Sequence, residues 1–373
     1  MSGPSKPSVS ASGPLRFALV GCGTIAPTQA QALQELPGLA SLTHCVDLDS
    51  SRAEVFAAKF SLKVATWAAV LADPAIDVIA LCTPSGHHGS LAAEAFLAGK
   101  HVIIEKPLEV TVAACDALLA AQRASGRRLA VISQHRFDPA SRTVRRLLDE
   151  NALGRLIAAD VRVPWYRTQE YYDSGDWRGT WALDGGGCLM NQGVHTVDLM
   201  LWLCGPVREV YARTATAAHD RIEVEDLVCA TLSFASGAIG TLFASTAAYP
   251  GFPVSLAIHG TDGSAVIEGD ELKTLAIKGS GTISGPAASA HAMQVATGGT
   301  KSAVKNASCP APKNLTDPAG WKWGDAHRAQ FADFINSIRE ERPALIEGEA
   351  ARAAVALIHA IYESARTGLP VSL

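Results

Sequence analysis

The first third of the chain alternates short apolar runs with segments of helical spacing. Strand-like runs occupy positions 17–20, 42–46, 76–84 and 100–108, and a helical stretch, LAAEAFLAGK, lies between the last two. Alternating strands and helices are typical of a parallel, doubly wound sheet that binds its ligand at the carboxyl ends of the strands. The pattern therefore predicts an α/β fold that begins with a Rossmann domain over residues 15–137.

Beyond residue 137 the pattern changes. A helix is expected over 141–150, and strand-like runs then follow one another with short turns, which favours antiparallel pairing. These runs lie at 155–163, 207–217, 226–234, 238–246 and 254–260. A Gly/Ala/Ser-rich segment from Gly279 to about Asn314 predicts a mobile surface loop, and two helices at 325–340 and 348–367 follow it. We expect a second, α+β domain over 138–373.

Composition limits the partners of this chain. Its 373 residues are 48% hydrophobic and 18% charged, which suits two globular domains, and a net charge of −4 gives no basic surface for nucleic acid. No apolar run approaches the roughly 20 residues of a membrane span. Residues 1–14 lack the apolar core of a signal peptide and read as a disordered tail. The eight cysteines show no C-x-x-C spacing, so we expect reduced thiols, a cytoplasmic protein and no metal site.

A glycine-rich turn follows the first strand, in the sequence GCGTIA. Gly21 allows a tight turn, and Gly23 lets the backbone approach a pyrophosphate. The helix that begins near Thr24 and Ile25 would point its first N–H groups at the phosphates. Glycine-rich turns between a strand and a helix are common, so this motif needs support from elsewhere in the chain.

That support comes from Asp47, at the end of the second strand. An acid there can accept both ribose hydroxyls of an adenosine and would repel a 2′-phosphate, so we expect NAD in preference to NADP. A solvated acid in a turn is the alternative, and Arg52 could still pair with a 2′-phosphate. Other polar or turn-forming residues stand at the carboxyl ends of the later strands, where a cofactor would lie: Thr83, Pro84, Glu105 and Lys106.

Lys106 allows two interpretations. It is either a surface lysine paired with Glu105, or a cation that positions a substrate hydroxyl and stabilises the developing alkoxide. The residues alone do not separate these alternatives.

The loop RTQEYYDSGDWRGTWALD also calls for an explanation. Arg167 and Arg178 offer planar forks for a carboxylate or phosphate, and Tyr171 and Trp177 offer flat faces for a sugar or base. The alternative is an aromatic cluster that packs the loop onto the sheet.

The segment GGGCLMNQGVHTVD places Asn191 and His195 one turn apart on a predicted helix, beside an apolar stripe. A histidine, with a pKa of about 6.5, can exchange a hydroxyl proton near neutral pH. Gly185, Gly186 and Gly187 would keep side chains away from the reacting groups. A buried histidine bonded to backbone is the alternative.

Together, GCGTIA, Asp47, TPSGHH, AGKHVIIEKP and GGGCLMNQGVHTVD resemble the Gfo/Idh/MocA family of NAD(P)-dependent sugar and polyol oxidoreductases. The resemblance implies a Rossmann domain followed by a domain with a large, mostly antiparallel open sheet, which often forms a homodimer or homotetramer interface. It also implies that Lys106 and His195 lie beside the reacting carbon, and that His88 belongs to the cofactor-binding turn.

The second domain looks most like the UDP-N-acetylglucosaminuronate 3-dehydrogenases, which oxidise the sugar C3 hydroxyl with NAD. This likeness implies substrate contacts from Arg136, Arg167, Tyr171, Trp177, Arg178, Asn191 and Gln192. Asn191 stands where many family members carry aspartate, and it can orient a hydroxyl but cannot titrate. His135 stands where those relatives tend to have asparagine. Oxidation of inositol or a simple sugar, reduction of a keto-sugar, an NAD-dependent glycosidase and a non-catalytic dinucleotide sensor are the alternatives.

Overall fold

The computed structural model describes residues 13–279, 283–284, 322 and 324–373. These fall into two compact units. The first unit contains the described residues up to Gln134 and those from 324 to Arg352; the second contains the described residues from His135 to 322 together with Ala353–Leu373. The first twelve residues and nearly all of the expected loop from Gly279 to Asn314 lie outside the described residues.

The first unit is built on a parallel sheet of six strands in the order β3-β2-β1-β4-β5-β6. The strands are β1 (Leu15–Val20), β2 (Ala40–Val46), β3 (Lys63–Val64), β4 (Val78–Leu81), β5 (His101–Ile104) and β6 (Leu129–Val131). The helices between them are α1 (Ala26–Gln34), α2 (Ser50–Phe60), α3 (Trp67–Ala72), α4 (His88–Leu97) and α5 (Val112–Ser125). The strand order reverses between β1 and β4, the position at which such sheets bind ligands. The doubly wound parallel sheet is therefore confirmed.

One helix from late in the sequence completes this unit. The helix α10 (Asp325–Arg339) buries Phe331 and Phe334 in the same apolar cluster as Phe17 of β1 and Leu33 of α1. Its Gln330 amide donates to the Val131 carbonyl at 2.7 Å and accepts from the backbone of Ser133 at 3.1 Å. This helix, which the sequence pattern predicts in the second domain, thus packs on the Rossmann sheet.

The second unit contains a sheet of nine strands in the order β14-β13-β12-β11-β7-β10-β9-β8-β15. All neighbouring pairs are antiparallel except β7 with β10. The strands are β7 (Leu156–Pro164), β8 (Val207–Ala215), β9 (Leu227–Phe234), β10 (Ile239–Ser245), β11 (Ser255–Gly260), β12 (Gly263–Glu268), β13 (Glu271–Ile277), β14 (Ile283–Ser284) and β15 (Val371–Ser372). The mostly antiparallel second sheet is confirmed.

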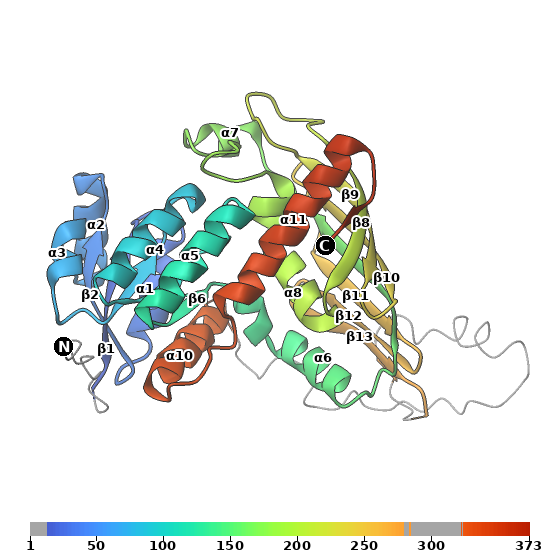
Figure 1. The fold of residues 1–373 in the computed structure, drawn as a ribbon, viewed down its shortest axis with the longest axis horizontal. Coiled ribbons are helices and arrows are strands. Elements are labelled where there is room, and N and C mark those ends of the chain that lie inside the picture. Colours follow the sequence, from blue (N-terminus) through green and yellow to red (C-terminus); the bar gives the residue numbers. More distant parts are fainter. Residues whose placement is uncertain (1–12, 280–282, 285–321, 323) are drawn as a thin grey trace, which may run out of the picture. The chain divides into compact units, whose positions relative to one another are not determined.

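Helices cover one face of this sheet. The helix α8 (Val194–Cys204) packs on β7 and β11, and α6 (Pro139–Asp149) packs on β12, β13 and α8 (Figure 1). A short helix, α7 (Gln169–Asp173), lies in the loop after β7, and α11 (Gly348–Thr367) precedes the last strand. The helices thereby fix the start of α8, where the predicted Asn191 and His195 stand, against the sheet.

No helix in the described part of the chain is long and apolar enough to cross a membrane. The seven described cysteines are unpaired thiols, and five of them are buried: Cys22, Cys45, Cys115, Cys188 and Cys204. These five thiols belong to the packed interior of the two units.

Candidate active site

The glycine-rich turn after β1 shows which of its glycines the protein itself requires. Gly21 has a φ of +92°, and a Cβ there would lie 2.6 Å from the Cys82 carbonyl oxygen. A Cβ on Gly23 would meet nothing within 4 Å. Packing therefore explains Gly21, whereas Gly23 leaves open space beside the exposed Thr24 and the first turn of α1. This is room for a phosphate group next to a helix N-terminus.

Asp47 is not a solvated acid. Its side chain is 7% exposed, and its Oδ2 accepts the Cys22 N–H of the glycine-rich turn at 2.7 Å. Its Oδ1 accepts the Asp49 N–H at 2.9 Å, and Arg52 lies 3.5 Å away. The carboxylate thus holds the turn after β1 to the end of β2, and it retains lone pairs for ribose hydroxyls.

His88 connects the turns that follow β4 and β5. Its buried ring lies 2.8 Å from the Pro107 carbonyl oxygen and 3.0 Å from that of Thr83. Burial lowers the pKa of His88 to about 4, so the ring is neutral and its one N–H donates to one of these carbonyls. His88 therefore supports the turn that begins with Thr83 and Pro84. The Thr83 hydroxyl oxygen is buried and has no hydrogen-bond partner among the described residues, as expected for a group that meets a ligand.

Lys106 leaves the end of β5 partly buried, next to the buried Glu105. The Glu105 carboxylate accepts from the Gln29 side chain of α1 and from the Lys106 N–H at 3.1 Å. Burial raises the pKa of Glu105, while the Lys106 charge opposes that shift. The pair is thus built into the ligand-binding edge of the sheet and is not a surface ion pair.

In the second unit the segment around Asn191 is not one regular helix. A π-helical turn, Cys188–Gly193, precedes α8, so Asn191 lies in the wide turn and His195 in the first turn of the α-helix. The predicted α-helical spacing between these two residues is therefore wrong. Wide turns of this kind are frequent at functional sites.

The glycines before this turn are required by packing. A Cβ on Gly187 would collide with the Glu225 backbone carbonyl, and one on Gly186 with the Tyr362 hydroxyl. The buried Glu225 carboxylate accepts the N–H groups of Gly187 at 3.0 Å and Leu189 at 2.9 Å, and the Tyr362 hydroxyl at 2.9 Å. At Gly186 and Gly187, the space expected for a ligand is thus occupied by Tyr362 and Glu225.

The π-helical turn starts a network of polar side chains. Asn191 donates to the buried Asp184, and its amide oxygen accepts from Gln192. Gln192 also donates to the Tyr171 hydroxyl at 2.9 Å and accepts from Arg167 at 2.8 and 3.1 Å. These contacts place four of the predicted substrate-binding residues in one cluster.

Two further predicted residues extend the cluster. Arg178 donates to the Tyr171 hydroxyl at 2.7 Å, and its guanidinium lies 4.3 Å from the centre of that ring and 4.5 Å from that of Trp177. Tyr172, in contrast, is buried and bonds the Thr246 hydroxyl at 2.8 Å. Tyr172 therefore packs the loop onto the sheet, as the alternative interpretation expected. Tyr171 instead contacts both Arg167 and Arg178.

Arg136 is accounted for by an internal ion pair. Its guanidinium donates to the two oxygens of Asp198 at 2.8 and 2.6 Å, and both side chains are almost fully buried. It also lies 5.6 Å from the centre of the Trp202 ring. The predicted contact of Arg136 with a substrate has no support from this arrangement.

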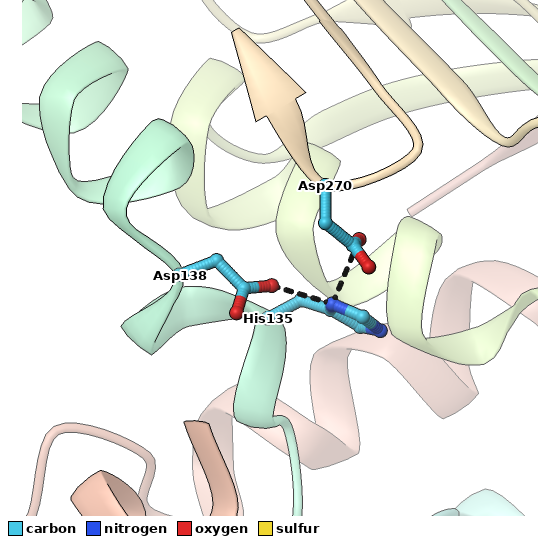
Figure 2. A group of neighbouring side chains, drawn as sticks. All are labelled: His135, Asp138 and Asp270. Atoms are coloured by element: carbon cyan, nitrogen blue, oxygen red, sulfur yellow. Dashed lines mark hydrogen bonds and ion pairs between the residues drawn. The ribbon is translucent and has the colours of Figure 1, made fainter. Parts of the chain in front are cut away.

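His195 has a neighbour that the predicted site did not include. The His135 ring lies 5.4 Å from the His195 ring, at 84° to it. Its Nδ1 is 2.7 Å from Asp138 and 3.2 Å from Asp270 (Figure 2). The spacing of His135 and Asp138, three residues apart, was a visible signal for part of this cluster, whereas nothing local points to Asp270.

Comparison with known proteins agrees with both units. A family model described as the NAD-binding Rossmann fold of an oxidoreductase family matches residues 15–133, and one for the GFO/IDH/MocA C-terminal domain matches residues 141–266. The crystal structure of the WlbA dehydrogenase from Bordetella pertussis, in complex with NADH and UDP-GlcNAcA, is 30% identical with a TM-score of 0.82 and covers 98% of this chain and 99% of its own. The chain belongs to the Gfo/Idh/MocA family.

Members of this family with related sequences act on polyols. The inositol 2-dehydrogenase of Rhizobium meliloti is 26% identical over 68% of this chain and 76% of its own length. The NAD-dependent scyllo-inositol 2-dehydrogenase of Bacillus subtilis is 28% identical over 68% of this chain and 73% of its own. The protein is thus an NAD-dependent oxidoreductase of the sugar and polyol class, and its first unit is the NAD-binding domain.

Asp47 provides a test of cofactor preference. In the Asp47→Asn variant we expect the ratio of kcat/KM for NAD to that for NADP to fall about tenfold, because the carboxylate that repels a 2′-phosphate is gone; this corresponds to ~1.4 kcal/mol. Initial rates with each cofactor measure the ratio. Asp49→Asn is the matched control, since Asp49 caps α2 two residues further on. An unchanged ratio in Asp47→Asn would contradict the assignment.

Proposed function

We propose that the protein oxidises a hydroxyl group of an anionic nucleotide sugar to a ketone, with a UDP-sugar acid oxidised at C3 as substrate. The observation that carries this proposal is the pair Arg167 and Arg178. Both are ordered by Tyr171, and neither has a carboxylate partner within the described ranges. Ordered guanidinium groups without internal counter-charges suit a carboxylate or phosphate ligand.

The family comparison supports the same substrate class. The Bordetella pertussis dehydrogenase was crystallised with UDP-GlcNAcA, and the likeness extends over nearly the whole of both chains. A hollow of about 460 Å³ beside Arg167 adds a second argument, since it is lined by Trp165, Tyr166 and Phe252. Flat aromatic faces next to a cation suit a base or sugar ring.

Each proposed role follows from the chemistry of the side chain. His195 takes the hydroxyl proton as general base, and Lys106 stabilises the alkoxide that forms as the proton leaves. NAD, when bound, supplies the acceptor for the hydride that leaves the carbon bearing this hydroxyl group. Asn191 cannot titrate, so it orients Gln192 and through it the arginine cluster. That Lys106 and His195 act on one substrate remains part of this proposal.

Oxidation of an inositol on the same residues is the second candidate, and the inositol dehydrogenase relatives favour it. NADH formation with UDP-N-acetylglucosaminuronic acid, UDP-N-acetylglucosamine, myo-inositol and glucose separates the two. We expect kcat/KM to be at least about tenfold higher for the acid than for the neutral UDP-sugar, since one charged hydrogen-bonding group distinguishes them. Preferred turnover of inositol would support the second candidate. NAD binding without turnover of any of these compounds would indicate a dinucleotide sensor.

Arg178→Ala tests the anion-binding cluster. We expect KM for the UDP-sugar acid to rise about 10- to 100-fold, because a hydrogen bond to a charged group contributes roughly 1.5–3 kcal/mol, while kcat changes little. Steady-state kinetics measure both constants. Arg221→Ala is the matched control, since Arg221 is an exposed arginine whose charge is already paired with Asp173 at 2.7 Å. A similar KM in the two variants would argue against a role for Arg178 in binding.

A further inference from the structure

His135 is held against His195 by carboxylates from two different elements. The Asp138 Oδ2 lies 2.7 Å and the Asp270 Oδ1 3.2 Å from the same ring nitrogen, Nδ1 (Figure 2). The centre of the His195 ring is 5.4 Å away, and the two rings are nearly perpendicular, at 84°. An aromatic pair in this edge-to-face arrangement restricts the orientation of both rings.

The local structure around Asp138 and Asp270 places both carboxylates at His135. Asp138 is the N-cap residue of α6, yet its side chain makes no capping hydrogen bond and turns back to His135. Asp270 follows Gly269 in the two-residue turn between β12 and β13. Both residues have positive φ, 54° for Gly269 and 69° for Asp270. Such a turn fits a tight hairpin and carries the Asp270 carboxylate out to His135. The N-cap of α6 thus gives up its capping hydrogen bond, and the hairpin turn supplies a second carboxylate, to hold one imidazole.

We propose that His135 is a positioning residue for His195, with Asp138 and Asp270 holding its ring against the proposed general base. This inference rests on the proposed role of His195. It adds a function for a residue that the predicted catalytic and binding sets did not contain.

The charge of His135 follows from its partners. Burial disfavours the imidazolium, but the hydrogen bonds and charges of Asp138 and Asp270 outweigh this effect and raise the pKa of His135 to about 10. The His195 ring also lies beside it, and the guanidinium of Arg136, the next residue along the chain, is paired with Asp198. A cation beside His195 disfavours a second cation, so loss of the His135 charge is expected to make protonation of His195 easier.

The three side chains could also be considered as metal ligands, because their donor atoms all lie within 4.8 Å of one another. The geometry points to hydrogen bonds, since both carboxylates approach one nitrogen at distances typical of a shared N–H group. The imidazole that ligates a metal must instead be deprotonated at that nitrogen. Metal binding is therefore an outcome of the test that would overturn the proposal.

The first experiment follows the histidines directly. In protein labelled with ¹³C-histidine, the NMR signals of His135 and His195 can be assigned with the variants His135→Asn and His195→Asn. We expect the His135 signal not to titrate below about pH 9, and the His195 midpoint to rise by about one pH unit in His135→Asn. A His135 midpoint near 6.5, together with an unchanged His195 midpoint, would overturn the proposal. This readout needs no substrate.

The second experiment uses the pH dependence of kcat/KM for UDP-N-acetylglucosaminuronic acid with NAD. We expect the acidic limb in His135→Asn to move up by about one pH unit. In Asp270→Asn it should move down by less, because a carboxylate is lost while Asp138 still holds the charged His135 ring. Asparagine tolerates the positive φ of position 270, so the turn is kept. Asp262→Asn, in the turn before β12, is the matched control, because its carboxylate faces Lys278 at 3.8 Å.

The outcomes separate this inference from the proposed function. If wild-type protein oxidises the UDP-sugar acid and His195→Asn does not, an unshifted profile in His135→Asn overturns only the role of His135. If wild-type protein oxidises no sugar, the proposed function fails, and the NMR titration still decides whether His135 controls His195. Activation by added Zn²⁺ after treatment with a chelator would overturn the proposal, because Nδ1 would then be a metal ligand.

Discussion

Replacing His195 by asparagine should lower kcat by about a thousandfold. A positioned general base typically contributes a factor of roughly 10²–10⁴, and asparagine keeps a polar side chain but cannot accept the hydroxyl proton. Lys106→Ala should lower kcat by about a hundredfold, since it removes a charge that stabilises the alkoxide. Neither change should alter NAD affinity by more than about threefold, because the proposed cofactor contacts include Gly23, Asp47 and Thr83. Steady-state rates and titration of cofactor binding measure the two effects separately.

Matched variants show whether the losses are specific. His259 is also in the second unit, on β11, and its ring contacts the Ser264 hydroxyl at 2.9 Å. Lys63 is an exposed lysine of β3 in the first unit. His259→Asn and Lys63→Ala should keep turnover within about twofold of wild type, as expected for surface changes away from the site. Near-normal turnover in both His195→Asn and Lys106→Ala would remove the basis of the assignment.

The sequence was most informative where the pattern is local. Continuous apolar runs marked β4 and β5, which are buried along their whole length, and strand-like runs joined by short turns marked strands of the second sheet. The apolar positions of α10 indicated a helix with a buried face, but a helical pattern does not say which sheet that face meets. The prediction therefore assigned α10 to the second domain together with its neighbours in the sequence, whereas its Phe331 packs on Phe17 of the first unit. Likewise, short turns favoured antiparallel pairs and gave no sign of the parallel pair β7 and β10.

The same limit applies to the side chains of the site. Residue type marked Arg167, Tyr171 and Arg178 as ligand-binding candidates, and the structure joins them through Gln192. Residue type alone could not show that a candidate side chain is already paired with a residue distant in the sequence. The sequence does not show that Asp198 pairs with Arg136. Nor does it show that Asp270 approaches His135, because only the fold brings these residues together. The glycine run before the π-helical turn was interpreted as space for a ligand because Glu225 and Tyr362 are remote in the sequence.

Removal of Asp198 should cause the largest loss of stability among single substitutions of charged residues discussed for the second unit. Asp198→Ala leaves the Arg136 guanidinium buried without its carboxylate, since the two side chains are only 6% and 3% exposed. Breaking a buried ion pair from one side typically costs 3–5 kcal/mol, because the remaining charge is desolvated without compensation. We expect a decrease of that size in the free energy of unfolding, measured by urea titration at neutral pH. The exposed pair Arg146 and Glu150, with N–O distance 3.0 Å, is the comparison, and Glu150→Ala should cost no more than about 1 kcal/mol.

A double substitution distinguishes loss of the pair from loss of packing. In Arg136→Met with Asp198→Leu both charges are replaced by apolar groups, so no buried charge remains, and most of the stability lost in Asp198→Ala should return. The Trp202 ring, which now faces the guanidinium, would pack against the methionine side chain instead. If Asp198→Ala costs as little as Glu150→Ala, the pair is not desolvated in solution, and Arg136 is again available to bind an anion. If the double variant is as unstable as the single one, shape rather than charge controls this part of the core.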